Sequence, residues 1–362
     1  MGDIDVLIVG AGPSGMATAL AASEQGLSVQ IIEKHAQRLP YSRAILVNSS
    51  TLALLEPFGV AKQIIAHGVP VRSFAIRRFS GEILSTPILL PATSQPLINL
   101  PQIQTELCFE AALQARGVDI QRPCELIGLT QETDFVAVTL RDADGANREL
   151  RARFVVGADG FRSSVRELAG IAYPCVDFPR TIVAMDVEMD WPYQQDAVVW
   201  LEDRGGILAL RLPDGLIRLA GVDLERLRQV KGFPAPRKVV WKSEFEVHFA
   251  YAETYGSGRV WLAGDAAHVH SPVGGRGMNM GIADGIALGK ALASNALSAY
   301  GAERRAVAKS WVETNHMLTN IALGTDIGAR RKRKLARMAL NIAKVIMPNV
   351  IGNFIFKRLA GI

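Results

Sequence analysis

Residues 4–33 of the chain read IDVLIVGAGPSGMATALAASEQGLSVQIIE. The apolar run 4–9 predicts a buried strand, the glycine-rich run 10–15 a tight turn, and residues 16–26 a helix. A second apolar run, 28–32, predicts the next strand. A strand, turn, helix and strand within about 30 residues is the unit of a parallel α/β sheet, and we expect an α/β fold.

The turn GAGPSG matches the pattern G-x-G-x-x-G in the context that this pattern requires, between a strand and a helix. Gly10 permits the tight turn, Gly12 lets the backbone approach a pyrophosphate, and Gly15 lets the helix pack close to the strand. The helix N-terminus offers free amides to phosphates. We therefore predict a dinucleotide site whose contacts include Gly10, Gly12, Pro13, Ser14 and Gly15.

An acidic residue ends the second strand, as the same pattern requires. Glu33 stands 23 residues after Gly10, where a carboxylate can accept hydrogen bonds from both ribose hydroxyls. Lys34, beside it, belongs to the same predicted site. A carboxylate here disfavours a ribose 2′-phosphate, but the motif alone does not separate FAD from NAD.

Two further motifs follow downstream. Residues 154–166 read FVVGADGFRSSVR, and residues 260–285 read VWLAGDAAHVHSPVGGRGMNMGIADG. Taken singly, the first is an ordinary strand, turn and helix, and the second a glycine-rich loop between a strand and a helix. Their order after the first turn favours one shared cofactor site.

Together the three motifs resemble those of the class A, single-component FAD-dependent monooxygenases of the para-hydroxybenzoate hydroxylase type. The resemblance extends from Asp5 to about Leu292. It implies a Rossmann-like FAD-binding domain with an inserted β-rich substrate domain and a helical C-terminus. It also implies that Asp159, Gly160 and Arg166 support FAD and a visiting nicotinamide cofactor, and that the GD pair, Gly264 and Asp265, holds the ribityl chain.

The residue types of the loop that follows also favour a site for a flat ring, independently of the resemblance. Pro272 fixes the backbone, and Gly275 and Gly277 remove side chains where a flat ring must lie close. The helix that begins near Met278 points its dipole at such a ring, and Asn279 offers a hydrogen bond to it. Arg276 stands where the family commonly has glutamine; it adds positive charge near the flavin or points into solvent.

Other positions match the family less specifically. The resemblance implies that Arg43 lies along the FAD and that Gln102 touches the ribityl chain, with Gln104 as a rival for that role. His268 and His270 have no accompanying Cys, Asp or Glu cluster, so we expect packing rather than a metal site, and we predict no bound metal.

By the resemblance, NAD(P)H (NADPH or NADH) reduces FAD, and a flavin hydroperoxide transfers oxygen to a phenolic, aromatic or polycyclic small molecule. No second G-x-G-x-x-G follows a later strand, so we expect the reductant to bind only transiently. No protein nucleophile is required. Two alternatives remain: an FAD-dependent dehydrogenase or reductase, for example of an unsaturated lipid chain, and a non-catalytic flavin-binding protein at membranes.

We expect two intertwined domains, since 362 residues are too many for one simple domain. Prolines within 71–98 and turn residues among alternating apolar and polar residues within 173–255 indicate a second sheet. Helices are expected at 51–58, 104–116 and from 281 onward. The predicted FAD-binding domain comprises 1–70, 99–172 and 256–325, the substrate domain 71–98 and 173–255, and the C-terminal helical segment 326–362.

Candidates for the substrate wall are Trp200, Arg211, Arg218, His248 and Tyr251.

Composition narrows the class of protein. The three cysteines form no CxxC pair and are expected to be reduced. We expect no signal peptide, and the sequence has no apolar run of 18 residues. These observations together predict a cytoplasmic protein. The net charge of +5 owes much to the cluster at 330–334, so we expect no nucleic-acid binding. Because the apolar segment 342–356 follows this cluster, weak membrane-surface contact is the minority alternative.

Overall fold

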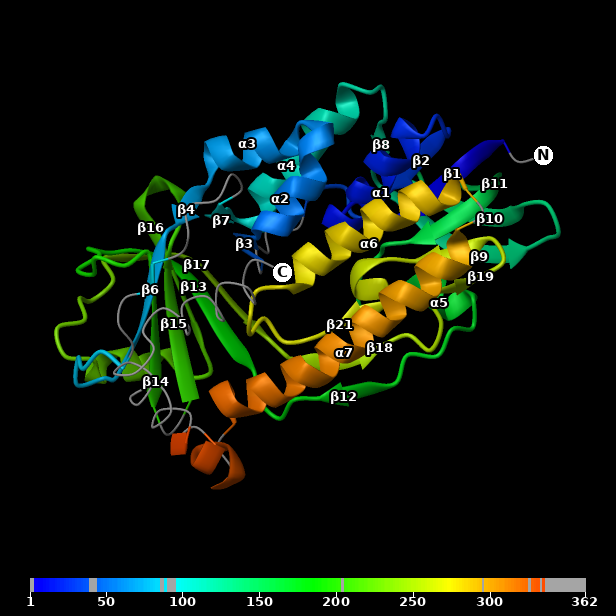
Figure 1. The fold of residues 1–362 in the computed structure, drawn as a ribbon. Helices are drawn as coiled ribbons and strands as arrows, with labels where there is room; N and C mark the ends of the chain where they lie inside the picture. Colours follow the sequence, from blue (N-terminus) through cyan, green and yellow to red (C-terminus); the bar gives the residue numbers. More distant parts are fainter. Residues whose placement is uncertain are drawn as a thin grey trace.

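The computed structural model describes residues 3–38, 44–84, 96–202, 205–294, 296–324, 327–332 and 334–335, and the backbone of 88–89. Figure 1 shows a parallel sheet at one end, a largely antiparallel sheet at the other, and two long helices running diagonally in front of them. The result is a mixed α/β fold, as the sequence predicts.

The parallel sheet has the strand order β8-β2-β1-β11-β20. In the described chain β19 closes one edge antiparallel to β20, and β9 and β10 extend β11 as an antiparallel meander. Val6, Leu7 and Ile8 of β1 are fully buried, which is why this apolar run forms the centre. The strands are β1 (Ile4–Val9), β2 (Val29–Ile32), β8 (Ile120–Gln121), β9 (Cys124–Gln131), β10 (Val136–Asp142), β11 (Asn147–Gly157), β19 (Gly256–Ser257) and β20 (Val260–Leu262).

Helices α1 (Pro13–Glu24) and α6 (Gly277–Leu292) pack together unusually closely. Gly281, Gly285 and Gly289 lie four residues apart, on the face of α6 that meets α1. A Cβ at Gly285 would lie 2.4 Å from the carbonyl oxygen of Ser14, and one at Gly289 would lie 2.7 Å from that of Thr18. Only glycine allows this backbone contact, which brings the start of α6 against the turn that starts α1.

The second sheet has the strand order β17-β13-β16-β15-β14-β5-β6 and is antiparallel except for the β14–β5 pair. On one face, Ala197 and Leu210 pack with Val71 and Leu97. On the other, Trp200 and Leu219 pack beneath the 3-10 turn η3 (Leu224–Gln229). The strands are β5 (Ser73–Arg77), β6 (Ile88–Leu89), β13 (Ile182–Glu188), β14 (Ala197–Glu202), β15 (Gly205–Arg211), β16 (Leu216–Gly221) and β17 (Lys238–Phe245).

Two small sheets, β3-β7-β4 and β12-β18-β21, complete the described strands. Their strands are β3 (Leu46–Val47), β4 (Val69–Val71), β7 (Leu97–Asn99), β12 (Cys175–Asp177), β18 (His248–Tyr251) and β21 (His268–Val269). The remaining helices and 3-10 turns are α2 (Ser49–Leu55), η1 (Glu56–Phe58), α3 (Val60–His67), α4 (Gln102–Gln114), α5 (Ser164–Leu168), η2 (Pro213–Gly215), η4 (Gly264–Ala266) and α7 (Leu297–Leu323).

The structure confirms the first strand, turn, helix and strand, and it places the turn of the β10–β11 hairpin at Asp142–Gly145. It also corrects the expected elements. The helix expected at 51–58 is α2 followed by η1, and a further helix, α3, begins after Gly59, whose φ of 75° breaks the helix. β18 lies within the range expected for the second sheet but pairs with β21 instead. The division into domains remains a prediction.

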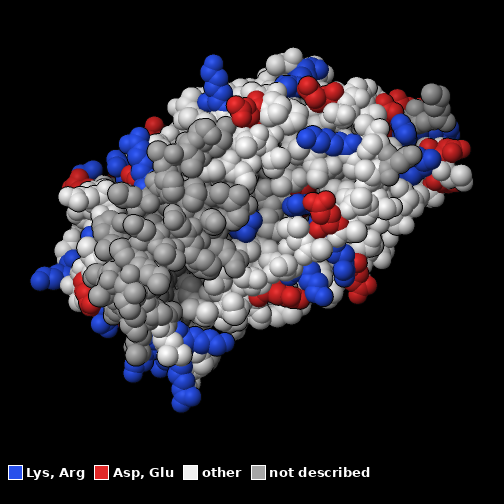
Figure 2. Space-filling model, viewed as in Figure 1, with Lys and Arg blue, Asp and Glu red and all other residues white. Residues whose placement is uncertain are grey.

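The basic cluster lies beyond α7. Arg330, Arg331, Lys332 and Lys334 are exposed, and Figure 2 shows Lys and Arg side chains gathered at the lower end of the molecule. The apolar segment 342–356 lies outside the described residues. Among the helices that are described, none is both long and apolar enough to cross a bilayer.

The close contact between α1 and α6 predicts that Gly285→Ala destabilises the protein. Alanine gains up to about 1 kcal/mol in helix propensity, but overpacking costs about 1–3 kcal/mol, and here the clash is with backbone. The free energy of unfolding, measured by chemical denaturation, is therefore expected to fall. The control is Lys290→Ala at an exposed position of the same helix. Equal stability of Gly285→Ala and wild type would show that the helices separate without penalty.

Candidate functional site

The glycine-rich turn is built by backbone contacts that exclude side chains. Gly10 has φ of 104°, and a Cβ there would lie 2.3 Å from the carbonyl oxygen of Ala158. At Gly15 a Cβ would lie 2.1 Å from the oxygen of Gly10. Gly12 differs, because no atom lies within 4 Å of its Cβ position. Gly10 and Gly15 are thus required by the protein itself, whereas Gly12 leaves space beside the N-terminus of α1.

Glu33 lies beside this turn, at the carboxyl end of β2. Its Oε2 accepts a hydrogen bond from the amide of Ala11 (3.2 Å) and its Oε1 one from the amide of His35 (3.0 Å). Lys34, next to it, is exposed. The carboxylate is therefore fixed next to the turn; its contact with a ribose stays a prediction.

Gln102 is the first residue of α4, and its side-chain nitrogen donates to Glu106 (2.9 Å). Burial raises the pKa of Glu106 despite this hydrogen bond and the nearby positive charges of Arg38 and Arg122; the charge of Glu33 acts in the same direction as burial. Gln102 and Glu106 therefore form one polar group near Glu33. Arg43, the other residue expected along the cofactor, lies outside the described residues.

The second motif is held together around Asp159. Its carboxylate accepts hydrogen bonds from the Ser163 hydroxyl (2.5 Å) and the Val165 amide (3.2 Å). Burial raises its pKa, although these hydrogen bonds act against the rise. Gly160, which follows, has φ of 83°, a conformation that favours glycine. Asp159 thereby shapes the loop that leads into α5.

Arg166 and Tyr173 join the second motif to the third. The buried guanidinium of Arg166 donates to the carbonyl oxygens of Phe161 (2.8 Å) and Ala266 (3.0 Å). It also lies 3.9 Å over the ring of Tyr173, whose hydroxyl donates to the backbone oxygen of Asp265 (3.0 Å). The structure thus uses Arg166 to hold two motifs at a fixed separation.

The third motif touches the first through Ser14. Gly264 has φ of 64°, and a Cβ there would lie 2.2 Å from the Ser14 hydroxyl oxygen. Asp265, one residue on, is exposed at the carboxyl edge of the parallel sheet. Pro272 is exposed as well, and Met278 is half-buried in the first turn of α6. Ligands of open α/β sheets bind at this edge.

Asn279 locks the glycine loop from within the protein. Its side-chain nitrogen donates to the backbone oxygens of Leu46 (2.8 Å) and Gly275 (2.9 Å), and its oxygen accepts from the amide of Asn48 (2.9 Å). Both amide hydrogens are therefore committed, and the buried side chain acts by positioning the loop. Gly277 is open, since its Cβ position has no neighbour closer than 3.8 Å.

Arg276 does not simply point into solvent, which is one of the two alternatives drawn from the sequence. Its guanidinium lies 4.5 Å over the ring of Trp311 in α7. The Trp311 indole donates to Nε2 of His270 (3.1 Å), and burial lowers the pKa of His270 to about 4. A neutral imidazole therefore supports the indole on which Arg276 rests.

A buried charged network underlies the third motif. Asp284 of α6 accepts hydrogen bonds from His268 Nε2 (2.7 Å), Arg304 Nε (2.6 Å) and the amide of Gly264 (3.2 Å). Burial alone would raise the pKa of Asp284, but His268 and Arg304 more than offset it and hold that pKa below its ordinary value. His268 is thus engaged within the protein by a hydrogen bond to a buried carboxylate, a partner that is not predicted from the sequence.

The comparisons with known proteins agree with this geometry. The family described as "FAD binding domain" matches residues 3–208 and 223–315. The chain belongs to this FAD-binding family.

Among its relatives, rifampicin monooxygenase of Streptomyces venezuelae is 31% identical over 91% of this chain and 74% of its own length. Pentachlorophenol 4-monooxygenase of Sphingobium chlorophenolicum is 29% identical over 92% of this chain and 68% of its own. The crystal structure of p-nitrophenol 4-monooxygenase from Pseudomonas putida aligns with a TM-score of 0.87 at 25% identity, covering 99% of both chains. The chain is accordingly an FAD-dependent, NAD(P)H-using monooxygenase.

Several residues of this candidate site are not among those singled out from the sequence, although some of them carry a signal. Glycines at 281, 285 and 289 repeat every four residues, a signal that predicts close helix packing. Asp284, a carboxylate in the middle of a mostly apolar helix, is a signal for a buried partner. Tyr173 and Asn48 carry no such signal, because their contacts depend on segments distant in the sequence.

We predict that Asp284→Asn destabilises the protein by about 3–5 kcal/mol at pH 7, since it leaves the partly buried charge of Arg304 without its counter-charge. Because folding lowers the pKa of Asp284, its contribution is present above the ordinary carboxyl pKa of about 3.9 and is lost as the pH falls through the lowered value. Denaturant unfolding of wild type and variant between neutral and acid pH measures this.

The difference between the two proteins is expected to shrink at the acid end. Asp223→Asn, at an exposed position, is the control, expected to change stability by no more than about 0.5 kcal/mol. A constant difference across the pH range would show that the charge of Asp284 contributes nothing to stability.

Proposed function

We propose that FAD lies along the edge where the three motifs meet. Its pyrophosphate takes the space beside Gly12 and the first amides of α1, and Glu33 accepts the ribose hydroxyls. Asp265 accepts from the ribityl chain, and the flavin ring lies on the glycine loop. What supports this is the direct packing of the motifs on one another, Gly10 on Ala158 and Gly264 on Ser14.

We propose distinct tasks for the remaining predicted site residues. Arg166 and Asn279 act as positioning residues, since Arg166 donates to two backbone oxygens and both side-chain amide hydrogens of Asn279 are engaged within the protein. Asp159 shapes its loop. The others border the cofactor. This proposed set comprises Gly10, Pro13, Ser14, Gly15, Lys34, Arg43, Gln102, Gly160, Gly264, Pro272, Gly275, Gly277 and Met278.

The reduced FAD supplies the activation of dioxygen, which the protein's own side chains do not. We propose that the oxygen acceptor is a phenolic or other electron-rich aromatic molecule, polycyclic ones included. The relatives support this class: two are named for rifampicin and pentachlorophenol, and one solved neighbour is an aklavinone-11 hydroxylase with FAD and aklavinone, 26% identical with a TM-score of 0.76.

We propose that the substrate binds against the face of the second sheet that carries Ala197, Leu210 and Arg218. This face meets the glycine loop at Leu46, which packs on its apolar cluster and lies 3.0 Å from the Cβ position of Gly275. Apolar side chains there exclude water from the reacting atoms. Trp200, another candidate for the substrate wall, points to the opposite face and packs on Phe233.

Arg218 is a buried charged residue on this face. It is 2% exposed, forms a bidentate ion pair with Asp186 and stacks 4.6 Å from Trp241. The other candidates lie elsewhere: Arg211 pairs with Asp196 at the surface, and His248 and Tyr251 belong to β18.

The predicted domain division and cytoplasmic location also remain proposals. Strands β5 and β6 and strands β13–β17 fall within the two ranges proposed for the substrate domain. The three unpaired cysteines support a reducing compartment.

Gly12→Ala is expected to weaken FAD binding about 10-fold or more, equal to about 1.4 kcal/mol, because the methyl group takes the space of the pyrophosphate. The stability of the apoprotein should fall by no more than about 1 kcal/mol, the cost of alanine in place of glycine at an N-cap, since nothing lies within 4 Å of that Cβ and φ is −77°. Fluorescence titration with FAD and thermal unfolding of the apoprotein measure both. Gly15→Ala is the contrast and should destabilise the apoprotein itself. Unchanged FAD affinity in Gly12→Ala would place the pyrophosphate elsewhere.

The function is tested by following NADPH and NADH oxidation together with dioxygen uptake against a panel of phenols and aromatic polyketides. We expect substrate-stimulated oxidation, matching dioxygen uptake and an oxygenated product. Oxidation of the nicotinamide with reduction of the organic substrate and no dioxygen uptake would instead support a reductase.

A further inference from the structure

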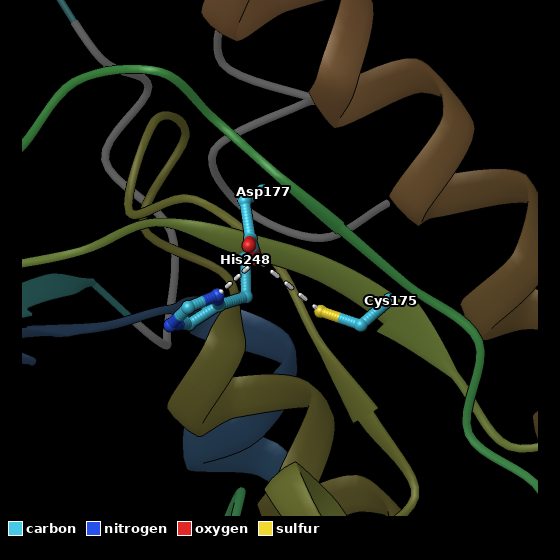
Figure 3. A group of neighbouring side chains, drawn as sticks. All are labelled: Cys175, Asp177 and His248. Atoms are coloured by element: carbon cyan, nitrogen blue, oxygen red, sulfur yellow. Dashed lines mark hydrogen bonds and ion pairs between the residues drawn. The ribbon is translucent and has the colours of Figure 1, made fainter.

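A cluster of three metal-ligand side chains lies on the β12-β18-β21 sheet, outside the proposed FAD site (Figure 3). Cys175 and Asp177 are two residues apart on β12, so their side chains share one face of the strand. His248 of β18 stands directly opposite Asp177 in the antiparallel pair. Strand periodicity and register, not loop conformation, therefore bring the three side chains together.

The distances within the cluster suit a tetrahedral metal ion. The Cys175 sulfur lies 3.7 Å from Oδ1 of Asp177, and Nδ1 of His248 lies 2.7 Å from the same oxygen. The usual zinc bond lengths place sulfur and oxygen ligands about 3.6 Å apart, and nitrogen and oxygen ligands about 3.4 Å apart. The distance between the Cys175 sulfur and the Asp177 oxygen already matches this value. Nδ1 of His248 must move about 0.7 Å away from the same oxygen.

The surroundings of His248 orient it as a ligand. Its ring stacks on Phe161 at 4.5 Å and 11°, which fixes the plane of the imidazole. Its second nitrogen, Nε2, lies 3.9 Å from a carboxylate oxygen of Glu246, which is near but too far for a hydrogen bond. Metal-bound histidines usually donate their other N–H to such a carboxylate. Nδ1 faces the carboxylate of Asp177 at 2.7 Å and is therefore the nitrogen placed to act as the ligand atom.

The donor set also indicates the kind of metal. A thiolate, an imidazole and a carboxylate match zinc and similar borderline divalent ions, whereas calcium and magnesium take oxygen ligands. Without metal, burial raises the pKa of the Cys175 thiol, and the charge of Asp177 raises it further. The thiol is therefore protonated at neutral pH, and binding would release its proton.

We propose that Cys175, Asp177 and His248 bind one Zn²⁺-class divalent cation, with water in the fourth position. This departs from the expectation, drawn from the sequence, that the cysteines are ordinary and that no metal binds. The ion cross-links β12 to β18 beside Phe161, the residue that follows Asp159 and Gly160. It thereby stabilises the junction between the second motif and this sheet.

The test uses the purified flavoprotein, freed of metal by a chelator. Calorimetric titration with Zn²⁺ should show one saturable site, and Co²⁺ should give the visible bands of a tetrahedral thiolate complex at wavelengths longer than the flavin bands. Glu246→Gln, which alters a carboxylate beyond hydrogen-bond distance of His248, should weaken Zn²⁺ binding by no more than about 10-fold. Cys175→Ser and His248→Gln should weaken it further, and Cys175→Ser should remove the thiolate bands. His67→Gln, at an exposed position of α3, is the control.

A second readout shows whether the variants fold. The metal-free variants should unfold at the wild-type temperature, and Zn²⁺ should raise that temperature in the wild type but not in Cys175→Ser. Absence of saturable binding, or equal binding by wild type, Cys175→Ser and His248→Gln, would overturn the proposal. None of these readouts uses turnover, so this result is independent of the proposed function.

Discussion

Backbone contact between α1 and α6 is the constraint on which the described site depends. Gly281, Gly285 and Gly289 let α6 lie directly on α1, and the same contact places Gly264 on Ser14. The glycine turn that starts α1 and the glycine loop that precedes α6 therefore share one edge of the sheet. With α6 farther from α1, the two ends of an extended dinucleotide could not be held together.

Hydrogen bonds from buried charged side chains then hold together the motifs that helix packing brings close. Asp284 is buried, yet it stays ionised because His268 and Arg304 surround it, and it holds the amide of Gly264. Arg166 reaches from the second motif to a backbone oxygen of the third. Buried charges of this kind are expensive unless fully partnered, so they impose one arrangement of the motifs.

The sequence predicts the motifs because each is a local signal. The residues 4–33 show their strand, turn and helix by periodicity and glycine placement, and the structure agrees. The role of Asn279 is different: the motif marks the residue, but not that its amide bonds Leu46 and Gly275, because Leu46 lies more than 200 residues away. Likewise, the pairing of β18 with β21 depends on long-range register, which alternating residues do not encode.

The parallel pair β5–β14 has a consequence for how the chain is made. Ala75 of β5 pairs with Val198 of β14, so the second sheet combines segments of the chain that are synthesised far apart in time. During translation, the edge of β5 that pairs with β14 stays unpaired until β14 has been synthesised and has left the ribosome. Pairings at such separation form slowly, and unpaired edges attract other chains. Yield in a heterologous host should therefore depend on chaperones and on the rate of synthesis, even when the finished protein is stable.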